Sequence, residues 1–485
     1  MEKKDLKPAG VFKYFEEICQ VPRPSKKEEK MIAYLKAFGA KHNLETKVDE
    51  AGNVLIKKPA TPGKENLQTV VLQSHIDMVC EKNNDVQHDF LTDPIETEID
   101  GEWLKAKGTT LGADNGIGVA TELAILADDS IEHGPLECLF TVDEETGLTG
   151  AFALQEGFMS GDILLNLDSE DEGEIFIGCA GGIDSVAEFT YKEVEIPAGY
   201  FFFKVEVKGL KGGHSGGDIH LGRGNANKIL NRFLSRMAGR HDLYLCEING
   251  GNLRNAIPRE AYAICAVPED AKHDVRTELN IFTSEMEDEL SVVEPDLKLV
   301  LESEAPRKTA IDQDTTTRLL KALYAAPHGV YAMSQDIPGL VETSTNLASV
   351  KMKPNHVIRI ETSQRSSILS ARNDMANTVR AVFQLAGANV TFGEGYPGWK
   401  PNPDSAIRKE MEEVYMKLYG KKPAIMAIHA GLECGILGSA YPHWDMISFG
   451  PTISSPHSPD EKVNIESVSK FWEFLKATLA AIPTK

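Results

Sequence analysis

The sequence predicts an α/β protein with a central mixed, mostly parallel sheet flanked by helices, into which an α+β domain is inserted. Two observations support this fold class. Near both ends of the chain, short apolar runs alternate with helical segments, which is typical of a largely parallel sheet. The middle of the chain instead has strands of alternating apolar and polar residues beside longer helical segments, which favours two-layer α+β packing.

The outer part of the chain supplies the strands and helices of the parallel layer. Residues 11–42 have the apolar spacing of helices, and residues 113–129 predict a further helix capped by Asp114 or Asn115. Four short apolar runs predict buried strands, at 69–73, 136–142, 162–167 and 446–450.

The middle of the chain predicts the inserted domain. Half-exposed strands are expected at 201–207 and 355–361, and helices at 226–237, 275–286 and 377–385. Residues 396–404 hold three prolines and one glycine, as a connection between domains often does. We therefore expect one domain made of residues 1–185 and 396–485, and a second domain of residues 186–395.

Composition excludes several classes of protein. Among 485 residues, 51 are Lys or Arg and 73 are Asp or Glu, so the net charge of −22 disfavours nucleic-acid binding. No run reaches the roughly 18 apolar residues of a membrane span, and the start of the chain lacks the apolar stretch of a signal peptide. Seven scattered cysteines without a C-x-x-C pair predict no disulfide framework. We expect a cytoplasmic protein without nucleic-acid or membrane partners.

Side chains that bind metals follow the predicted strands of the outer domain. Ligands of an open α/β sheet bind beyond the carboxyl ends of its strands, so these side chains are expected to meet. Imidazoles and carboxylates together suit zinc, and also manganese or cobalt. The candidates outnumber the three protein ligands of one catalytic zinc, so two metals sharing a carboxylate explain them better. They are His75 with Asp77, Asp114, Glu144 with Glu145, Asp168, and His457.

Each candidate also has a simpler interpretation when it is taken alone. A single histidine beside a strand is more often structural than a ligand, and carboxylates at strand ends are commonly solvated. Asp114 could be only a helix N-cap. Their joint placement after successive strands is what favours a metal centre.

Six motifs make a more specific identification. SHIDMV, LGADNGIG, DEETGLTG, NLDSED, HAGLECGI and SPHSPDE resemble, in order and spacing, the co-catalytic di-zinc exopeptidases. That family includes carboxypeptidase G, the carnosinases and bacterial cytosolic dipeptidases. The resemblance covers essentially the whole chain, including GGHSGGDI in the insert. It implies a zinc-exopeptidase-like catalytic domain with an inserted lid domain.

The resemblance also implies roles for the candidate residues. One metal would be held by His75, Asp114 and Asp168, and the other by Asp114, Glu145 and His457. Asp77 would orient His75, Glu144 would be the general base, and the peptide bond after Asp114 would be cis.

In the insert, His214 resembles a histidine that polarises the substrate carbonyl, in several relatives across a dimer interface. Asn255 and Arg365 resemble residues that bind the substrate carboxylate, and Glu433 a residue near the substrate amine. Simpler interpretations stay open: His214 in an exposed glycine-rich turn, Arg365 paired with a surface acid, and Glu433 in a structural role.

The resemblance implies metal-dependent hydrolysis of dipeptides, with broad specificity that includes C-terminal histidine. It further implies two divalent ions, zinc or else manganese or cobalt, and a homodimer formed through the inserted domain. Two alternatives remain. One is a related amide bond, cleaved by an N-acyl-amino-acid deacylase or an aminopeptidase. The other is a peptide-binding protein without catalysis.

Overall fold

The chain forms two compact units in the computed structural model, which describes residues 2–485. The first unit contains the chain up to Cys179, Trp399–Ala427 and Leu432–Lys485, and the second contains Ala180–Gly398 and Ile428–Gly431. The sequence analysis placed the two transitions after residues 185 and 395. It did not foresee the short return of the chain to the second unit at Ile428–Gly431.

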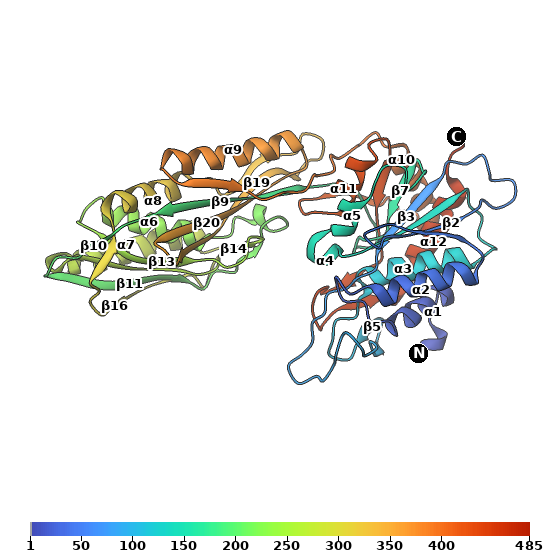
Figure 1. Ribbon diagram of the computed structural model, residues 1–485, viewed down its shortest axis with the longest axis horizontal. Coiled ribbons are helices and arrows are strands. Elements are labelled where there is room, and N and C mark those ends of the chain that lie inside the picture. The colour runs from blue at the N-terminus through green and yellow to red at the C-terminus, as the bar shows by residue number, and fades with distance from the viewer. Residues whose placement is uncertain (1) are drawn as a thin grey trace. The chain divides into compact units, whose positions relative to one another are not determined.

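The first unit is built on a mixed eight-stranded sheet in the order β1-β2-β6-β3-β7-β23-β8-β22 (Figure 1). The four central strands pair in parallel, whereas β1 pairs with β2, β2 with β6, and β8 with β23 in antiparallel. These central strands are the four apolar runs of the sequence analysis, and β3, β6 and β7 are buried along their whole length. The strands are β1 (Glu45–Val48), β2 (Val54–Lys58), β3 (Val70–His75), β6 (Leu136–Thr141), β7 (Ile163–Asn166), β8 (Glu174–Cys179), β22 (Ala424–Ile428) and β23 (Asp445–Ser448).

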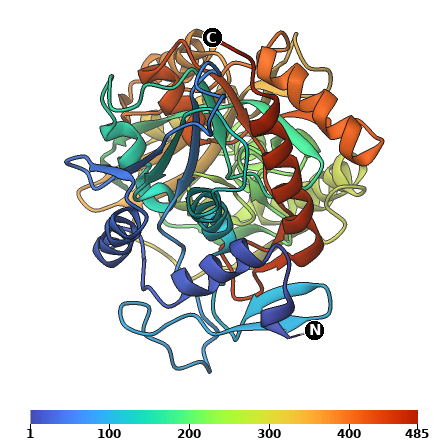
Figure 2. The ribbon, with the colours of Figure 1, turned by 90° about the vertical axis from the view of Figure 1, so that its right-hand side faces the viewer.

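Helices cover this sheet. Helix α3 packs on β3, α1 packs on α3, and the C-terminal helix α12, red in Figure 2, packs against α10. The buried positions of α1, such as Phe12, Phe15 and Ile18, follow the spacing that the sequence analysis used. The helices are α1 (Ala9–Cys19), α2 (Glu29–Lys41), α3 (Ala113–Ala127), α4 (Glu144–Gly147), α5 (Thr149–Ala153), α10 (Ala406–Tyr419), α11 (Glu433–Ala440) and α12 (Ile465–Ala481).

The first unit also contains a small antiparallel sheet with a hairpin loop at one end. Its order is β24-β25-β5-β4, and the loop between β24 and β25 contains His457. The strands are β4 (Thr97–Asp100), β5 (Trp103–Ala106), β24 (Ile453–Ser454) and β25 (Lys462–Asn464).

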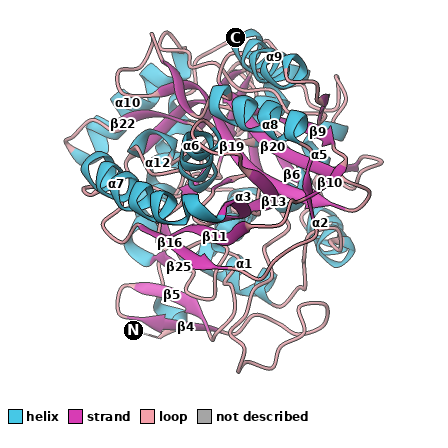
Figure 3. Cartoon of the chain, turned by 90° about the vertical axis from the view of Figure 1, so that its left-hand side faces the viewer, coloured by secondary structure: helices cyan, strands magenta, loops and turns pink. Residues whose placement is uncertain are grey.

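The second unit is an α+β layer pair, as the sequence predicts. Its nine-stranded sheet has the order β16-β11-β15-β13-β19-β20-β9-β21, with β18 also paired to β19, and neighbouring strands are antiparallel. Four helices lie in front of these strands in Figure 3 and bury one apolar core against them. The elements are β9 (Gly181–Thr190), β11 (Tyr200–Lys208), α6 (Ala226–Ala238), β13 (Tyr244–Gly250), β15 (Ala261–Pro268), α7 (Lys272–Leu290), β16 (Lys298–Ser303), α8 (Gln313–Ala325), β18 (Gly329–Met333), β19 (Val341–Lys353), β20 (Val357–Ser366), α9 (Leu369–Leu385) and β21 (Asn389–Phe392).

Two short strand pairs complete the second unit: β10 (Glu193–Glu195) with β17 (Thr309–Ile311), and β12 (Gly213–His214) with β14 (Ala256–Ile257). All seven cysteines are free thiols. Within residues 2–485, no helix has both the length and the apolar character needed to cross a membrane.

Candidate metal centre

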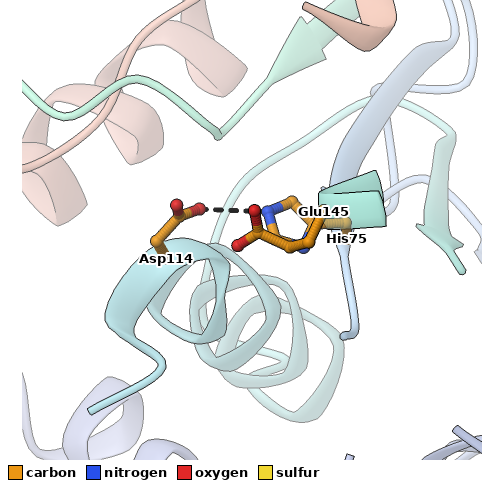
Figure 4. Close-up of side chains that lie close together, drawn as sticks. All are labelled: His75, Asp114 and Glu145. Carbon is orange, nitrogen blue, oxygen red and sulfur yellow. Dashed lines mark hydrogen bonds and ion pairs between the residues drawn. The ribbon is translucent and has the colours of Figure 1, made fainter. Parts of the chain in front are cut away.

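Five predicted ligands meet beside the carboxyl ends of the central strands. His75 is the last residue of β3, Glu145 lies in the short helix α4 just beyond β6, and Asp168 follows β7. Asp114 lies at the start of α3, and His457 lies in the hairpin loop between β24 and β25. Figure 4 shows His75, Asp114 and Glu145 pointing toward one another from three elements.

The distances between these side chains are short. One ligand atom from each of His75, Asp114 and Glu145 lies within 4.8 Å of the others. The Nε2 atom of His75 is 3.0 Å from Asp114 Oδ1 and 3.3 Å from Asp168 Oδ1. The Nε2 atom of His457 is 3.0 Å from both Asp114 Oδ2 and Glu145 Oε2. The two oxygens of Asp114 thus face different histidines.

Helix α3 does not use Asp114 or Asn115 as a side-chain cap, so this expectation was wrong. The helix begins at Ala113 with Gly112 as N-cap, and Asp114 and Asn115 have non-helical backbone angles. Their side chains are engaged elsewhere: Asp114 contacts the two histidines, and the Asn115 amide donates to Asp168. The Asp114–Asn115 peptide bond is cis, as the resemblance implies.

Asp77 connects His75 to the segment that carries the two glutamates. It is fully buried, and its Oδ1 atom is 3.3 Å from His75 Nδ1. Its carboxylate accepts hydrogen bonds from the backbone N–H groups of Glu144 and Glu145, at 3.0 and 3.2 Å, and from the Ser25 hydroxyl at 2.7 Å. One carboxylate therefore orients an imidazole and holds the start of α4.

A second group of buried carboxylates, Glu28, Asp77 and Asp143, lies close together next to the first. Glu28 Oε1 accepts from the backbone N–H of Lys26 at 2.9 Å and of Asp143 at 3.0 Å, and Asp143 accepts from the hydroxyls of Thr146 and Thr149. These oxygens already stabilise the turn at Asp143, whose φ is 52°.

Burial and mutual charge shift the pKa values of the cluster. Burial lowers the pKa of His75, but the neighbouring carboxylates of Asp168, Asp114 and Asp77 raise it well above its usual value. Hydrogen bonds to Asp114 and Glu145 raise the pKa of His457 to about 11. These carboxylates therefore provide a negative field that favours a cation.

The two remaining glutamates have raised pKa values because they are removed from solvent. Burial raises the pKa of Glu144 well above its usual value, and the charges of Asp168, Glu433 and Glu145 add to the shift. Burial and the Asp168 charge raise the pKa of Glu433 to about 7. Glu433 accepts hydrogen bonds from Gln73 at 2.6 Å and Thr141 at 2.8 Å, so it is tied to β3 and β6.

The donor set fits a divalent transition metal. Two imidazole nitrogens and three carboxylates are the ligand types that zinc, manganese and cobalt take. Glu145 Oε1 is buried and has no hydrogen-bond partner among the described residues, so this oxygen is available as a metal ligand. The coarse prediction of a metal-type cluster agrees with this geometry.

The sequence analysis missed several residues near these sites. Glu461 and Arg23 are buried beside the ligand loops. Glu170 is a further such residue, and burial together with the charges of Asp114 and Asp168 raises its pKa to about 8. Glu461 ends the motif SPHSPDE, which was a usable signal, whereas nothing in the sequence around Arg23 singles it out.

In the second unit, three of the expected substrate-binding residues lie near one another. Arg365 is 7% exposed; its Nη1 donates to the Tyr396 hydroxyl at 2.9 Å and its Nη2 lies 3.4 Å from His214 Nε2. Asn255 is exposed, and its backbone carbonyl accepts a hydrogen bond from the backbone N–H of Ser215 at 2.8 Å. Arg365 is thus buried among polar groups and is not paired with a surface acid.

Burial and the Arg365 charge lower the pKa of His214 to about 4, so its imidazole is neutral near pH 7. His429 lies in the return segment of the second unit and is buried, with its Nε2 2.7 Å from the Ser344 hydroxyl. Tyr396 and His429 extend this polar group beyond the residues named from the sequence.

Comparisons with known proteins identify the family of the chain. It is 47% identical over 484 residues, covering 100% of both sequences, to the cytosol non-specific dipeptidase of Escherichia coli (strain K12). The crystal structure of aminoacylhistidine dipeptidase from Vibrio alginolyticus matches with a TM-score of 0.93 and 49% identity, covering 100% of this chain and 99% of that one.

An aminopeptidase PepT structure from Bacillus cereus shares the fold, with a TM-score of 0.61, 17% identity and coverage of 98% and 99%. The family model described as peptidase family M20/M25/M40 matches residues 71–481, a range that contains all five of the clustered side chains. This chain, with its group of imidazoles and carboxylates at the end of a mixed sheet, therefore belongs to peptidase family M20/M25/M40.

Proposed function

We propose that the chain is a metal-dependent dipeptidase that hydrolyses free dipeptides with broad specificity, including dipeptides that end in histidine. The observation that carries this proposal is the 47% identity, over the full length of both sequences, to a cytosol non-specific dipeptidase. The similarity to an aminoacylhistidine dipeptidase, at 49% identity, supports the inclusion of C-terminal histidine.

Two divalent ions, zinc or else manganese or cobalt, are proposed as cofactors. His75, Asp114 and Asp168 would hold one ion, and Asp114, Glu145 and His457 the other, so that Asp114 contacts both. The distance of 3.0 Å from each Asp114 oxygen to a different histidine supports this division. When bound, such cations make a water molecule more acidic and the substrate carbonyl more electrophilic.

Glu144 would transfer the proton. Its carboxylate takes a proton from the attacking water as the oxygen bonds to the scissile carbonyl carbon. It then delivers that proton to the amine nitrogen as the C–N bond breaks, which leaves a carboxylate and a free amine. The hydrogen bond from the Glu144 backbone N–H to Asp77 supports this role, because it holds the residue at the ligand segment.

Substrate recognition is proposed for four further residues. The guanidinium of Arg365, assisted by Asn255, would bind the dipeptide's carboxylate, for which a planar bidentate donor is well suited. Neutral His214 would donate a hydrogen bond to the substrate carbonyl. Glu433 would lie near the substrate amine, and its buried, unpartnered Oε1 supports a contact of this kind.

We further propose that the protein acts in the cytosol and forms a homodimer through the second unit. The first statement draws support from the name of the relative from Escherichia coli. Sedimentation of the purified chain tests the second, and a single species of one-chain mass would contradict it.

The proposed function is tested by product release from a panel of dipeptides, tripeptides and N-acyl amino acids, before and after chelation and with zinc restored. Cleavage limited to free dipeptides and dependent on metal is the expected result. Cleavage of N-acyl substrates would move the function to deacylation, and cleavage of longer peptides to an aminopeptidase. Binding of peptides without any turnover would instead indicate a peptide-binding protein.

A further inference from the structure

Two buried residues of opposite charge lie between the loops that carry the candidate metal ligands, and the reaction above uses neither. Glu461 and Arg23 are each 2% exposed. Glu461 lies in the same hairpin loop as His457, and Arg23 lies between α1 and α2. A charge is costly to bury unless hydrogen bonds or an opposite charge compensate it, so the partners of these two residues indicate what they do.

Glu461 binds the backbone at the start of α3. Its Oε2 accepts hydrogen bonds from the N–H groups of Leu111 and Gly112, at 2.8 and 2.9 Å. Its Oε1 accepts from the N–H groups of Ala113 and Asp114, at 2.7 and 3.2 Å. All four partners are donors, so each oxygen must act as an acceptor, and the ionised carboxylate is the form that fits.

The same residue is anchored in the sheet that carries the hairpin loop. Glu461 directly precedes β25, whose Lys462 pairs with Lys105 of β5 and with Ser454 of β24. His457 lies in the middle of the loop, and its side chain is 52% exposed. The carboxylate of Glu461 therefore joins the anchored end of this loop to the segment that presents Asp114.

Arg23 joins the segment after His75 to the same place. Its Nη1 donates to the carbonyl oxygens of Ile76 and Asp77, at 3.1 and 3.0 Å, and its Nη2 donates to Gly112 O at 2.6 Å. Gly112 has a φ of 69°, and a Cβ atom there would lie 2.5 Å from Arg23 Nη2. The backbone of Gly112 thus donates its N–H to the Glu461 carboxylate and accepts at its carbonyl from the Arg23 guanidinium.

We infer that Glu461 is a positioning residue of the metal centre, which sets the separation of Asp114 and His457 before a metal binds. Arg23 extends the connection from Gly112 to the segment that follows His75. The inference rests on the proposed function only in taking these three side chains as metal ligands. Without the Glu461 carboxylate, the hairpin loop and the start of α3 lose four hydrogen bonds. Loss of such a supporting contact typically weakens metal affinity about 10- to 100-fold.

The test is the zinc affinity of Glu461→Gln, measured by competition with a chromophoric chelator on the full chain. The amide has nearly the same size as the carboxylate. Its NH₂ group, however, replaces one acceptor oxygen and faces two backbone N–H donors. We expect zinc binding to weaken about 10- to 100-fold. The matched control is Glu466→Gln, whose carboxylate is 77% exposed on α12, and it should bind zinc like the wild type. Wild-type affinity in Glu461→Gln would overturn the inference.

Hydrogen exchange on the unaltered chain decides the question if that variant does not fold. The amides of Leu111–Asp114 should be protected in the chelated protein, because Glu461 accepts them whether or not metal is present. Their rapid exchange would overturn the inference. Neither measurement involves a substrate, so a chain that binds zinc through a preformed site but cleaves no dipeptide would contradict the proposed function alone. A wild-type chain that binds none of zinc, manganese and cobalt would overturn both.

Discussion

Glu144 and Glu145 are neighbours in the sequence, yet their carboxylates have different surroundings. Glu145 lies 3.0 Å from His457 Nε2 and has a buried oxygen that is free for a cation. The Glu144 carboxylate instead has a raised pKa because it is removed from solvent and faces other acids. Asp77 accepts hydrogen bonds from the backbone N–H groups of both residues, so one buried carboxylate holds the backbone of two residues for which we propose different roles.

The first prediction at the residue scale concerns Glu144. Glu144→Gln should lower kcat about 100- to 10,000-fold, the usual contribution of a general acid–base group, while the bound metal is retained. Metal content by atomic emission and steady-state kinetics measure the two quantities. Glu156→Gln, an exposed position of the first unit, is the control. Near-normal turnover in Glu144→Gln would remove the residue from proton transfer.

A second prediction concerns Arg365. Arg365→Ala should lower kcat/KM for free dipeptides about 10- to 100-fold, mainly by raising KM, because a hydrogen bond to a charged group is lost. Dipeptide amides, which lack the terminal carboxylate, should be affected much less. Kinetics on matched acid and amide substrates measure the difference, with Arg276→Ala, at an exposed position of the second unit, as control. Equal losses on both substrate series would argue against carboxylate binding.

At the scale of an element, α3 combines a non-helical start with a buried acid in its body. Its N-terminal segment is shaped by contacts to other loops, whereas its apolar residues pack on β3 and α1. Glu122 on this helix is fully buried; its Oε1 accepts from the Ser74 hydroxyl at 2.6 Å and its Oε2 has no hydrogen-bond partner among the described residues. Burial raises the pKa of Glu122 well above its usual value.

This raised pKa predicts a pH-dependent stability. A carboxyl group with a higher pKa in the folded state favours folding below its unfolded pKa of about 4.3, and this contribution is lost as pH rises through the folded pKa. The side chain in Glu122→Gln stays neutral at both pH values. The Tm of this variant minus that of the wild type should therefore be larger at pH 8 than at pH 5. Calorimetry of the chelated proteins measures both differences, with the exposed Glu473→Gln as control. A difference that does not change with pH would show that Glu122 is not buried as a neutral group.

Gly112 gives a second prediction for this element. Gly112→Ala should destabilise the protein, because a left-handed conformation costs a non-glycine residue about 1–2 kcal/mol and the added Cβ overlaps Arg23 Nη2. Denaturant unfolding measures the loss. Gly63→Ala has a similarly positive φ but open space around its Cβ position, so it separates the backbone cost from the overlap. Equal losses of stability at the two positions would mean that the Arg23 side chain moves aside and that the overlap adds no cost.

At the scale of the molecule, the clustered ligands belong to one unit, while the second unit has an apolar core of its own. A metal that binds only the folded state adds stability, about 2.7 kcal/mol for one site at a free concentration 100 times its dissociation constant. Chelation should therefore speed hydrogen exchange in β3 and α3 and leave β11 and α7 largely unchanged. Exchange followed by mass spectrometry measures this, and a loss of protection confined to the second unit would contradict the metal assignment.

The classes of element and the types of metal-binding side chain could be predicted from the amino-acid sequence alone. Runs such as 69–73 and 136–142 predict buried strands because a strand covered on both faces needs apolar residues at successive positions. Since the carboxyl ends of parallel strands share one edge, the residues that follow them could be expected to meet. This local reasoning was sufficient for His75, Asp168 and the Glu144–Glu145 pair, and motif resemblance supplied the division of ligands between two metals.

Which distant polar groups form hydrogen bonds with one another depends on the folded arrangement of the chain. Gln73 and Glu433 are 360 residues apart yet form a buried hydrogen bond, and Glu461 accepts from the backbone N–H of Leu111, which lies 350 residues earlier in the chain. Such partners leave no periodic signal, because a buried carboxylate needs donors of the right geometry and those donors can be backbone groups of any residue type. For the same reason, Asp114 resembled a helix cap in the sequence. In the folded chain its oxygens face two histidines, from β3 and from the β24–β25 loop.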